Sequence, residues 1–206
     1  MTELTRAALW TRMRFLLDRL IHSIDSETFV DQCLDTLLEL LGADRGMVLL
    51  GRPGSAWRKV GARHRRRRDL SAVEQEEISR TTVDHAFGAG RCIIWEPGHD
   101  DSEAPRMSMM DLGILVAMAA PLRHARLGQK QAEGGIQGIV YLDFRAGRTI
   151  VGELHREFFE AAVILIAAVL DMRERLHMVR EDLRFAQAQT VDNRQGPTLE
   201  EFLRAQ

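Results

Sequence analysis

Two short apolar runs, separated by a polar segment, constrain the fold more than any other feature of the sequence. The first covers residues 114–120 and is followed by Pro121, and the second covers residues 136–144. Each has the length of a β-strand and is almost continuously apolar, which is typical of strands buried on both faces. Residues 123–135 between them are rich in Gly, Gln and charged side chains. We therefore expect two adjacent central antiparallel strands joined by a long loop, with Pro121 ending the first.

Helical patterns surround these runs. One amphipathic helix is expected within residues 1–23, and a second between an N-cap at Ser26 and an end at Gly42. A third is expected over residues 71–87, and the last from residue 153 to about residue 189.

Shorter strand patterns occur at residues 47–50, 57–62 and 91–95. Together with the two central strands they predict an α+β fold. Its core is a central antiparallel sheet of about six strands, with helices on both faces and a long C-terminal helix.

Composition narrows the class of protein. The chain has 206 residues, of which 45% are hydrophobic, and a net charge of -2, which argues against a dedicated nucleic-acid binder. No apolar run approaches the roughly 20 residues that span a bilayer. No signal peptide is recognisable at the N-terminus, so we expect a cytoplasmic protein without membrane contact. Cys33 and Cys92 are the only cysteines, which provides neither a disulfide framework nor a zinc ligand set, and we expect no metal site.

The basic run at residues 63–68 allows two interpretations. It could contact phosphate or nucleic acid. It could equally be a solvated loop, or one neutralised by the acidic residues 74–77 that follow it. We favour the second interpretation because the run is isolated and has no aromatic residues interleaved.

Apolar stripes near both ends of the chain predict a homodimer. The stripe of the last helix keeps strict three–four spacing with Arg and Glu between its members, which indicates a coiled-coil extension over residues 173–190. A second copy of the chain is the simplest partner for such a stripe. The expected dimerisation residues are Leu9, Met13, Leu16 and Leu20 near the N-terminus and Val169, Met172, Leu176, Val179 and Leu183 in the last helix. Residues 191–206 are expected to be a linker or a disordered tail.

Several motifs in sequence order resemble the GAF domain, a small-molecule sensor module. They are SMMDLGI at residues 108–114, AAPL at 119–122 and QGIVYLD at 137–143, with weaker similarity at 43–50 and 78–86. The resemblance covers residues 24–172. These motifs are similar to those of the N-terminal sensor GAF domains of bacterial enhancer-binding (AAA+) transcription activators. In those proteins an ATPase and a helix-turn-helix domain follow, and this sequence contains neither.

The resemblance implies a sensory, non-catalytic domain whose ligand lies beneath the third helix. The expected lining residues are His85, Arg91, Met109, Met110, Leu115, Met118 and Tyr141, an apolar set with a few polar groups. Neither the cysteines nor the motif sets of known GAF classes identify a cofactor. Two alternatives stay open: a GAF module that only dimerises, and a small enzyme that uses His85 as a base.

Overall fold

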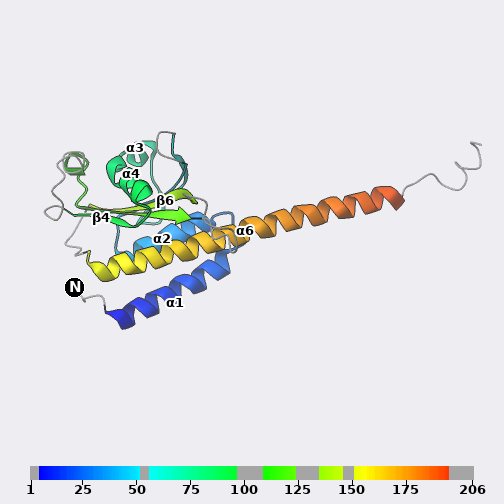
Figure 1. Cartoon of the computed structure of the whole chain (residues 1–206), viewed down its shortest axis with the longest axis horizontal. Coiled ribbons are helices and arrows are strands. Elements are labelled where there is room, and N and C mark those ends of the chain that lie inside the picture. Colours follow the sequence, from blue (N-terminus) through cyan, green and yellow to red (C-terminus); the bar gives the residue numbers. More distant parts are fainter. Residues whose placement is uncertain (1–4, 52–55, 97–108, 124–134, 146–150, 195–206) are drawn as a thin grey trace, which may run out of the picture. The chain divides into compact units, whose positions relative to one another are not determined.

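The structure is a computed structural model that describes residues 5–51, 56–96, 109–123, 135–145 and 151–194, with side chains described as far as residue 187. It divides into two units, Met1–Val169 and Leu170–Gln206. We describe each unit by itself. The first contains the sheet and its covering helices (Figure 1).

A six-stranded antiparallel sheet forms the centre of the first unit. Its order is β3-β2-β1-β6-β5-β4, and every neighbouring pair is antiparallel. The predicted pair of adjacent strands is therefore confirmed as β5 and β6. The strands are β1 (Arg45–Leu50), β2 (Arg58–His64), β3 (Arg68–Asp69), β4 (Ile93–Trp95), β5 (Val116–Arg123) and β6 (Ile136–Phe144).

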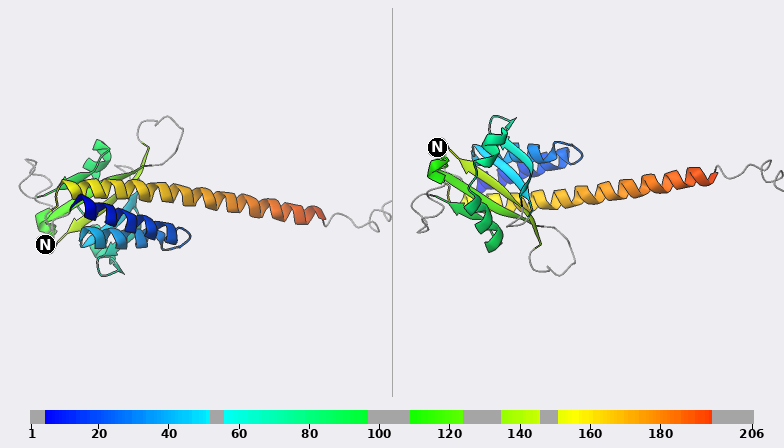
Figure 2. Two further views of the ribbon diagram at one scale, coloured as in Figure 1. Left: turned by 90° about the horizontal axis from the view of Figure 1, so that it is seen from below. Right: turned by 90° about the horizontal axis from the view of Figure 1, so that it is seen from above.

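Helices cover both faces of the sheet, as the sequence predicts (Figures 1 and 2). α3 (Ala72–Glu76) and α4 (Arg80–Ala89) lie on one face, where α4 packs over β5 and β6. α2 (Phe29–Leu41) packs on β1 and β2 from the other face, and α1 (Arg6–Ser23) packs on α2. The long C-terminal helix is α6 (Glu153–Arg194), and its first part lies on the same side of the sheet as α2.

The two apolar runs are buried on both faces because the core is two-sided. Ala117, Ala119, Ile139 and Tyr141 belong to one cluster with Val83 and Ala86 of α4. Alternating neighbours such as Val140 and Leu142 point to the opposite face, since successive strand residues do so. Leu142 lies there near Leu34 and Leu38 of α2. This arrangement explains why neither run shows polar alternation.

The third predicted helix is wrong as a single element. The structure contains two short helices, α3 and α4, separated at Glu77–Ser79. A capping box of Ser71 and Glu74 begins α3, and Ser79 begins α4 by accepting a hydrogen bond from the Thr82 amide. Backbone carbonyls at the break accept hydrogen bonds from Arg45, so the chain does not need helical partners there.

Other boundaries differ in smaller ways. Pro121 lies inside β5 rather than ending the strand, in register with Ile139. Within the described residues, β4 pairs with β5 only as far as Ala119, so no described strand neighbours that side of β5 at Pro121, where a missing amide proton is tolerated. α2 begins after Thr28 rather than Ser26, and its end at Gly42 in a left-handed conformation is as predicted.

The second unit contains the remainder of α6, from Leu170 onward. Several large apolar side chains on it are exposed: Met172, Leu176, Met178, Val179, Leu183 and Phe185. Among the described residues of the whole chain, no helix is both long and apolar enough to cross a bilayer.

Candidate functional site

A buried ion pair ties the α3–α4 segment to the central strand β6. Arg45, 2% exposed, donates hydrogen bonds to both carboxylate oxygens of Asp143, which is fully buried, at 2.6 to 3.1 Å. The same guanidinium donates to the backbone carbonyls of Glu74 and Glu77 at 3.0 and 2.5 Å. Arg145 adds a hydrogen bond to the Glu77 carbonyl at 3.0 Å. The break between α3 and α4 is therefore held by charged groups on β1 and β6.

Tyr141 extends this network beneath α4. Its hydroxyl donates to Asp143 at 3.5 Å and accepts a hydrogen bond from the Ser79 amide at 3.3 Å. Burial raises the pKa of Tyr141, with the Asp143 charge adding to the effect. The side chain is fully buried and bonded on both sides, so in this structure its role is to position the start of α4.

A cavity of about 490 Å³ lies beside this anchored segment, and we term it the α4 cavity. This volume falls within the range usual for small-molecule sites. Its apolar wall comes from β1, from the start of β2 and from the α3–α4 segment, and one wall residue, Trp57, packs edge-to-face on Phe87 with ring centroids 5.8 Å apart. The lining residues are Leu49, Ala56, Trp57, Lys59, Gln75, Glu76, Ile78, Arg80, Val83 and Asp84.

The polar side of the α4 cavity consists of charged side chains that pair with one another. Lys59 pairs with one carboxylate oxygen of Glu76, and Arg80 donates to the other at 3.2 Å. The hydrogen bond from Lys59, with a further contribution from Arg80, lowers the pKa of Glu76. The carboxylate therefore stays ionised and sits between two cations.

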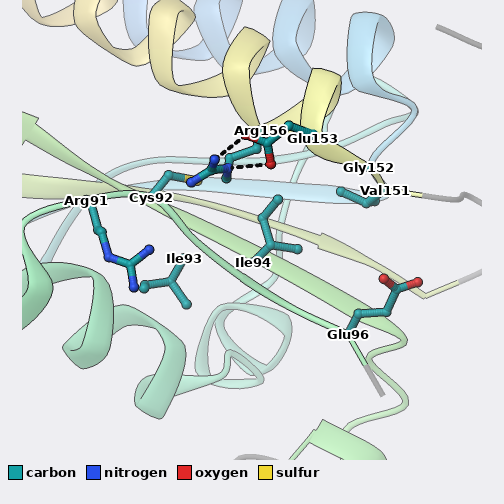
Figure 3. A pocket seen from close by; sticks show the side chains of 9 residues that line it. All are labelled: Arg91, Cys92, Ile93, Ile94, Glu96, Val151, Gly152, Glu153 and Arg156. Atoms are coloured by element: carbon teal, nitrogen blue, oxygen red, sulfur yellow. Dashed lines mark hydrogen bonds and ion pairs between the residues drawn. The ribbon is translucent and has the colours of Figure 1, made fainter. Parts of the chain in front are cut away.

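A second cavity, of about 430 Å³, lies between β4 and the start of α6 (Figure 3). Its floor contains Ile94 and Val151, and its rim carries Arg91, Glu96 and the ion pair between Glu153 and Arg156. Figure 3 shows the Arg156 guanidinium directed at Glu153 rather than into the cavity. We therefore consider it a weaker candidate than the α4 cavity.

Four of the five arginines of the basic run form ion pairs within the fold. Arg63 pairs with Asp35 at 2.9 Å, Arg65 with Asp44 at 3.0 Å, Arg67 with Glu39 at 2.8 Å and Arg68 with Glu74 at 2.6 Å. Only the last of these partners belongs to the acidic residues 74–77, because α2 and the residue just before β1 supply the others. A third cavity, of about 240 Å³, lies among these charges, and it is lined by both signs.

The structure does not gather the seven expected ligand residues into one cavity. Met109 and Tyr141 are buried in the cluster beneath α4, linked through Ser79 and Thr82. Met118 is buried between Ala117 and Ala119 in β5. It therefore points to the opposite face of the sheet from these two residues, which is the face that α2 covers. Arg91 lines the cavity beside β4, whereas His85, Met110 and Leu115 are exposed and line none of these three cavities.

Neither cysteine has the setting of a reactive thiol. Both are buried, Cys33 in α2 and Cys92 before β4. Burial, reinforced by the charge of Glu160, raises the pKa of Cys92 to about 12. A thiol with that pKa stays protonated near neutral pH.

Sequence reasoning missed the polar residues of the α4 cavity. Lys59 and Glu76 are 17 residues apart, and the predicted single helix over residues 71–87 gave no reason to bring them together. The sequence feature that could have indicated this cavity is Trp57, a large aromatic residue at the start of a predicted strand, two positions before the lone lysine of that strand.

Comparison with known proteins supports one family. The sequence pattern of the GAF domain matches residues 25–188. No curated protein matches the chain. The GAF domain of a putative sensor histidine kinase from Pseudomonas syringae pv. tomato aligns with a TM-score of 0.58 and 17% identity over 86% of this chain and 94% of that chain.

Bacteriophytochromes are similar in fold as well. The protein from R. palustris aligns with a TM-score of 0.66 and 13% identity, covering 92% of this chain and 42% of that chain. The chromophore-binding domain from Stigmatella aurantiaca aligns with a TM-score of 0.58 and 15% identity, covering 79% of this chain and 60% of that chain. This chain thus spans less than two thirds of these two relatives, and at such identities the likeness concerns the fold. With the family pattern covering most of its length, the chain belongs to the GAF domain family.

Proposed function

We propose that this GAF domain is a non-catalytic sensor that binds a small molecule in the α4 cavity. The observation that carries the proposal is the cavity itself, with an apolar wall and a few charged groups at one side. It adjoins the segment that Arg45 and Tyr141 fasten to β6. A ligand that shifts the α3–α4 segment would act on the central strand through these contacts.

The signal would pass to α6 in a homodimer and from there to an output domain, which we propose is a transcription regulator in the cytoplasm. Exposed apolar residues of α6 in the second unit support the dimer: Met172, Leu176, Val179 and Leu183 keep three–four spacing on one helix face. Such a stripe is stabilised when a second helix covers it.

In α1, the dimer contact would involve a different helix face from the one that the sequence predicts. Leu16 and Leu20 are fully buried within the protomer, and Val169 of α6 is almost fully buried as well. Trp10, Leu17 and Ile21 share a neighbouring face of α1 and are 72%, 39% and 56% exposed. We propose that these three, rather than Leu16 and Leu20, meet the second copy.

A ligand-free dimerisation module is the second candidate. It is favoured by the dense packing beneath α4, where residues such as Met109, Tyr141 and Ala119 are fully buried. A catalytic role has less support, since His85 is exposed on α4 and Cys92 is a buried thiol of raised pKa.

Native mass spectrometry of the purified chain, compared with its denatured mass, tests the choice. A dimer with a dissociable extra mass is expected for a sensor, and that mass identifies the class of ligand. A dimer at the bare polypeptide mass favours the dimerisation module. A monomer contradicts the dimerisation module and the relay through a dimeric α6, and a monomer without extra mass leaves the sensor unsupported as well.

The dimer is tested separately by Leu176→Asp and Leu183→Asp, with Met178→Asp as the matched control. Met178 is exposed on the same helix but lies off the stripe. We expect the first two variants to sediment as monomers with the melting temperature of the domain retained, and the control to remain dimeric. Dimers for all three variants would refute the coiled-coil contact.

A further inference from the structure

Two cations and one carboxylate meet at the charged side of the α4 cavity. Lys59 and Arg80 both approach the single carboxylate of Glu76. Arg80 is also the first residue of α4, so the positive end of the helix dipole adds to the potential there. The hydrogen bond from Lys59, together with the charges of Lys59 and Arg80, lowers the pKa of Glu76. A negatively charged group is therefore stabilised at this position.

Glu76 itself is easily moved. Its side chain is 62% exposed, and it lies at the end of the short helix α3. The Lys59 side chain is only 23% exposed, so this cation is the better fixed of the pair. If Glu76 turned into solvent, a carboxylate from another molecule could take its place between Lys59 and Arg80 without leaving either cation unpaired.

The remaining lining defines the body and the charge of that molecule. Ile78 and Val83 are buried and Trp57 is partly buried, which together provide an apolar and aromatic surface. Asp84 is the other acidic lining residue, and with Glu76 it balances Lys59 and Arg80 to a formal charge of zero. Once Glu76 turns into solvent, Lys59, Arg80 and Asp84 leave a formal charge of +1, which suits one carboxylate better than a group with two or more negative charges.

We infer that the α4 cavity binds a bulky apolar monocarboxylic acid, and that Glu76 holds the position of the ligand carboxylate until the ligand displaces it. This inference rests on the proposed sensory function of the same cavity and specifies the chemistry that it reads. The carboxylate would lie between Lys59 and Arg80, and the apolar body would lie against Trp57.

The test compares two probes by isothermal titration: 2-naphthoate, and 2-naphthamide as its uncharged counterpart. We expect 2-naphthoate to bind at least about tenfold more tightly than 2-naphthamide, since a charge-assisted hydrogen bond is lost with the amide. Glu76→Gln removes the competing carboxylate and should tighten 2-naphthoate about tenfold, whereas Lys59→Met should weaken it by a similar factor.

Asp84→Asn is the matched control, because it also removes a lining carboxylate but not the one that pairs with the two cations. It should change 2-naphthoate affinity much less than Glu76→Gln does. Melting temperatures of all variants confirm that each remains folded.

Two outcomes would overturn the inference. Equal binding of both probes, unchanged in Glu76→Gln and Lys59→Met, would show that the cavity accepts apolar molecules without reading charge, and the sensory proposal would stand. Binding of neither probe to any variant would refute the carboxylate assignment. A dissociable mass in native mass spectrometry would in that case still support a sensor of another ligand class.

Discussion

Arg45→Met is the change that tests the architecture of this domain most directly. Methionine preserves much of the apolar volume of the side chain but removes every hydrogen bond of the guanidinium. Asp143 would remain fully buried, with the Tyr141 hydroxyl at 3.5 Å and Arg145 Nε at 3.6 Å still beside it. The backbone carbonyl of Glu74 would lose the donor that it accepts from at 3.0 Å.

Removing one partner of a buried ion pair typically destabilises a protein by about 3–5 kcal/mol. For a chain of this size each kcal/mol lowers the melting temperature by about 2–4 °C, so we expect a fall of about 6–20 °C. The assay is thermal unfolding followed by circular dichroism. Arg67→Met is the matched control, because its pair with Glu39 is exposed on both sides, and such pairs contribute less than about 1 kcal/mol.

The double variant Arg45→Met/Asp143→Leu separates the cost of a poorly compensated buried carboxylate from the loss of the Arg45–Asp143 pair. Replacing both members with apolar groups should recover much of the stability, since no buried charge is then left alone. Equal melting temperatures for Arg45→Met and Arg67→Met would refute the view that Arg45 fastens the α3–α4 segment to β6.

Four further variants test other parts of the fold by thermal unfolding. Gly138→Ala should be strongly destabilising, because its Cβ would lie 2.2 Å from a backbone carbonyl oxygen of β1, whereas Gly88→Ala in α4 meets nothing within 4 Å and should be neutral or stabilising. Val140→Ala should cost about 1–3 kcal/mol, since it removes fully buried methyl groups of β6, and an unchanged melting temperature would contradict that placement. Burial lowers the pKa of His155, whose Nδ1 accepts a hydrogen bond from the Gly152 amide at 3.3 Å. The stability that neutral His155 contributes is thus complete above about pH 6.5 and lost as the pH falls below it. The melting temperature of His155→Gln should therefore depend less on pH between about 7.5 and 5.5 than that of the unchanged chain.

The sheet could be predicted because its signals are local. Residues 136–144 form β6 with the predicted bounds, and Gly42 and Gly90 end their helices in left-handed conformations. The division of the third helix could not be predicted in the same way. It depends on Arg45, which lies 29 and 32 residues away from the carbonyls that it binds.

The site was harder to predict than the fold for a related reason. In a strand buried on both faces, polar alternation no longer shows which residues share a face. The sequence pattern therefore places Met118 and Tyr141 in one predicted cavity, although their side chains point to opposite faces of the sheet. The charges of the α4 cavity come from β2, α3 and α4, and only the folded chain brings them together.

Because α1 packs on α2, the packed unit of this protein begins earlier in the chain than the family pattern does. The family pattern begins at residue 25, just after α1 ends at Ser23. Leu16 and Leu20 of α1 are nevertheless as buried as the centre of the sheet. A fragment cut at the family boundary would expose the surface of α2 that they cover, and we expect it to aggregate. For this protein the family pattern is therefore shorter than the part of the chain that packs together in the fold.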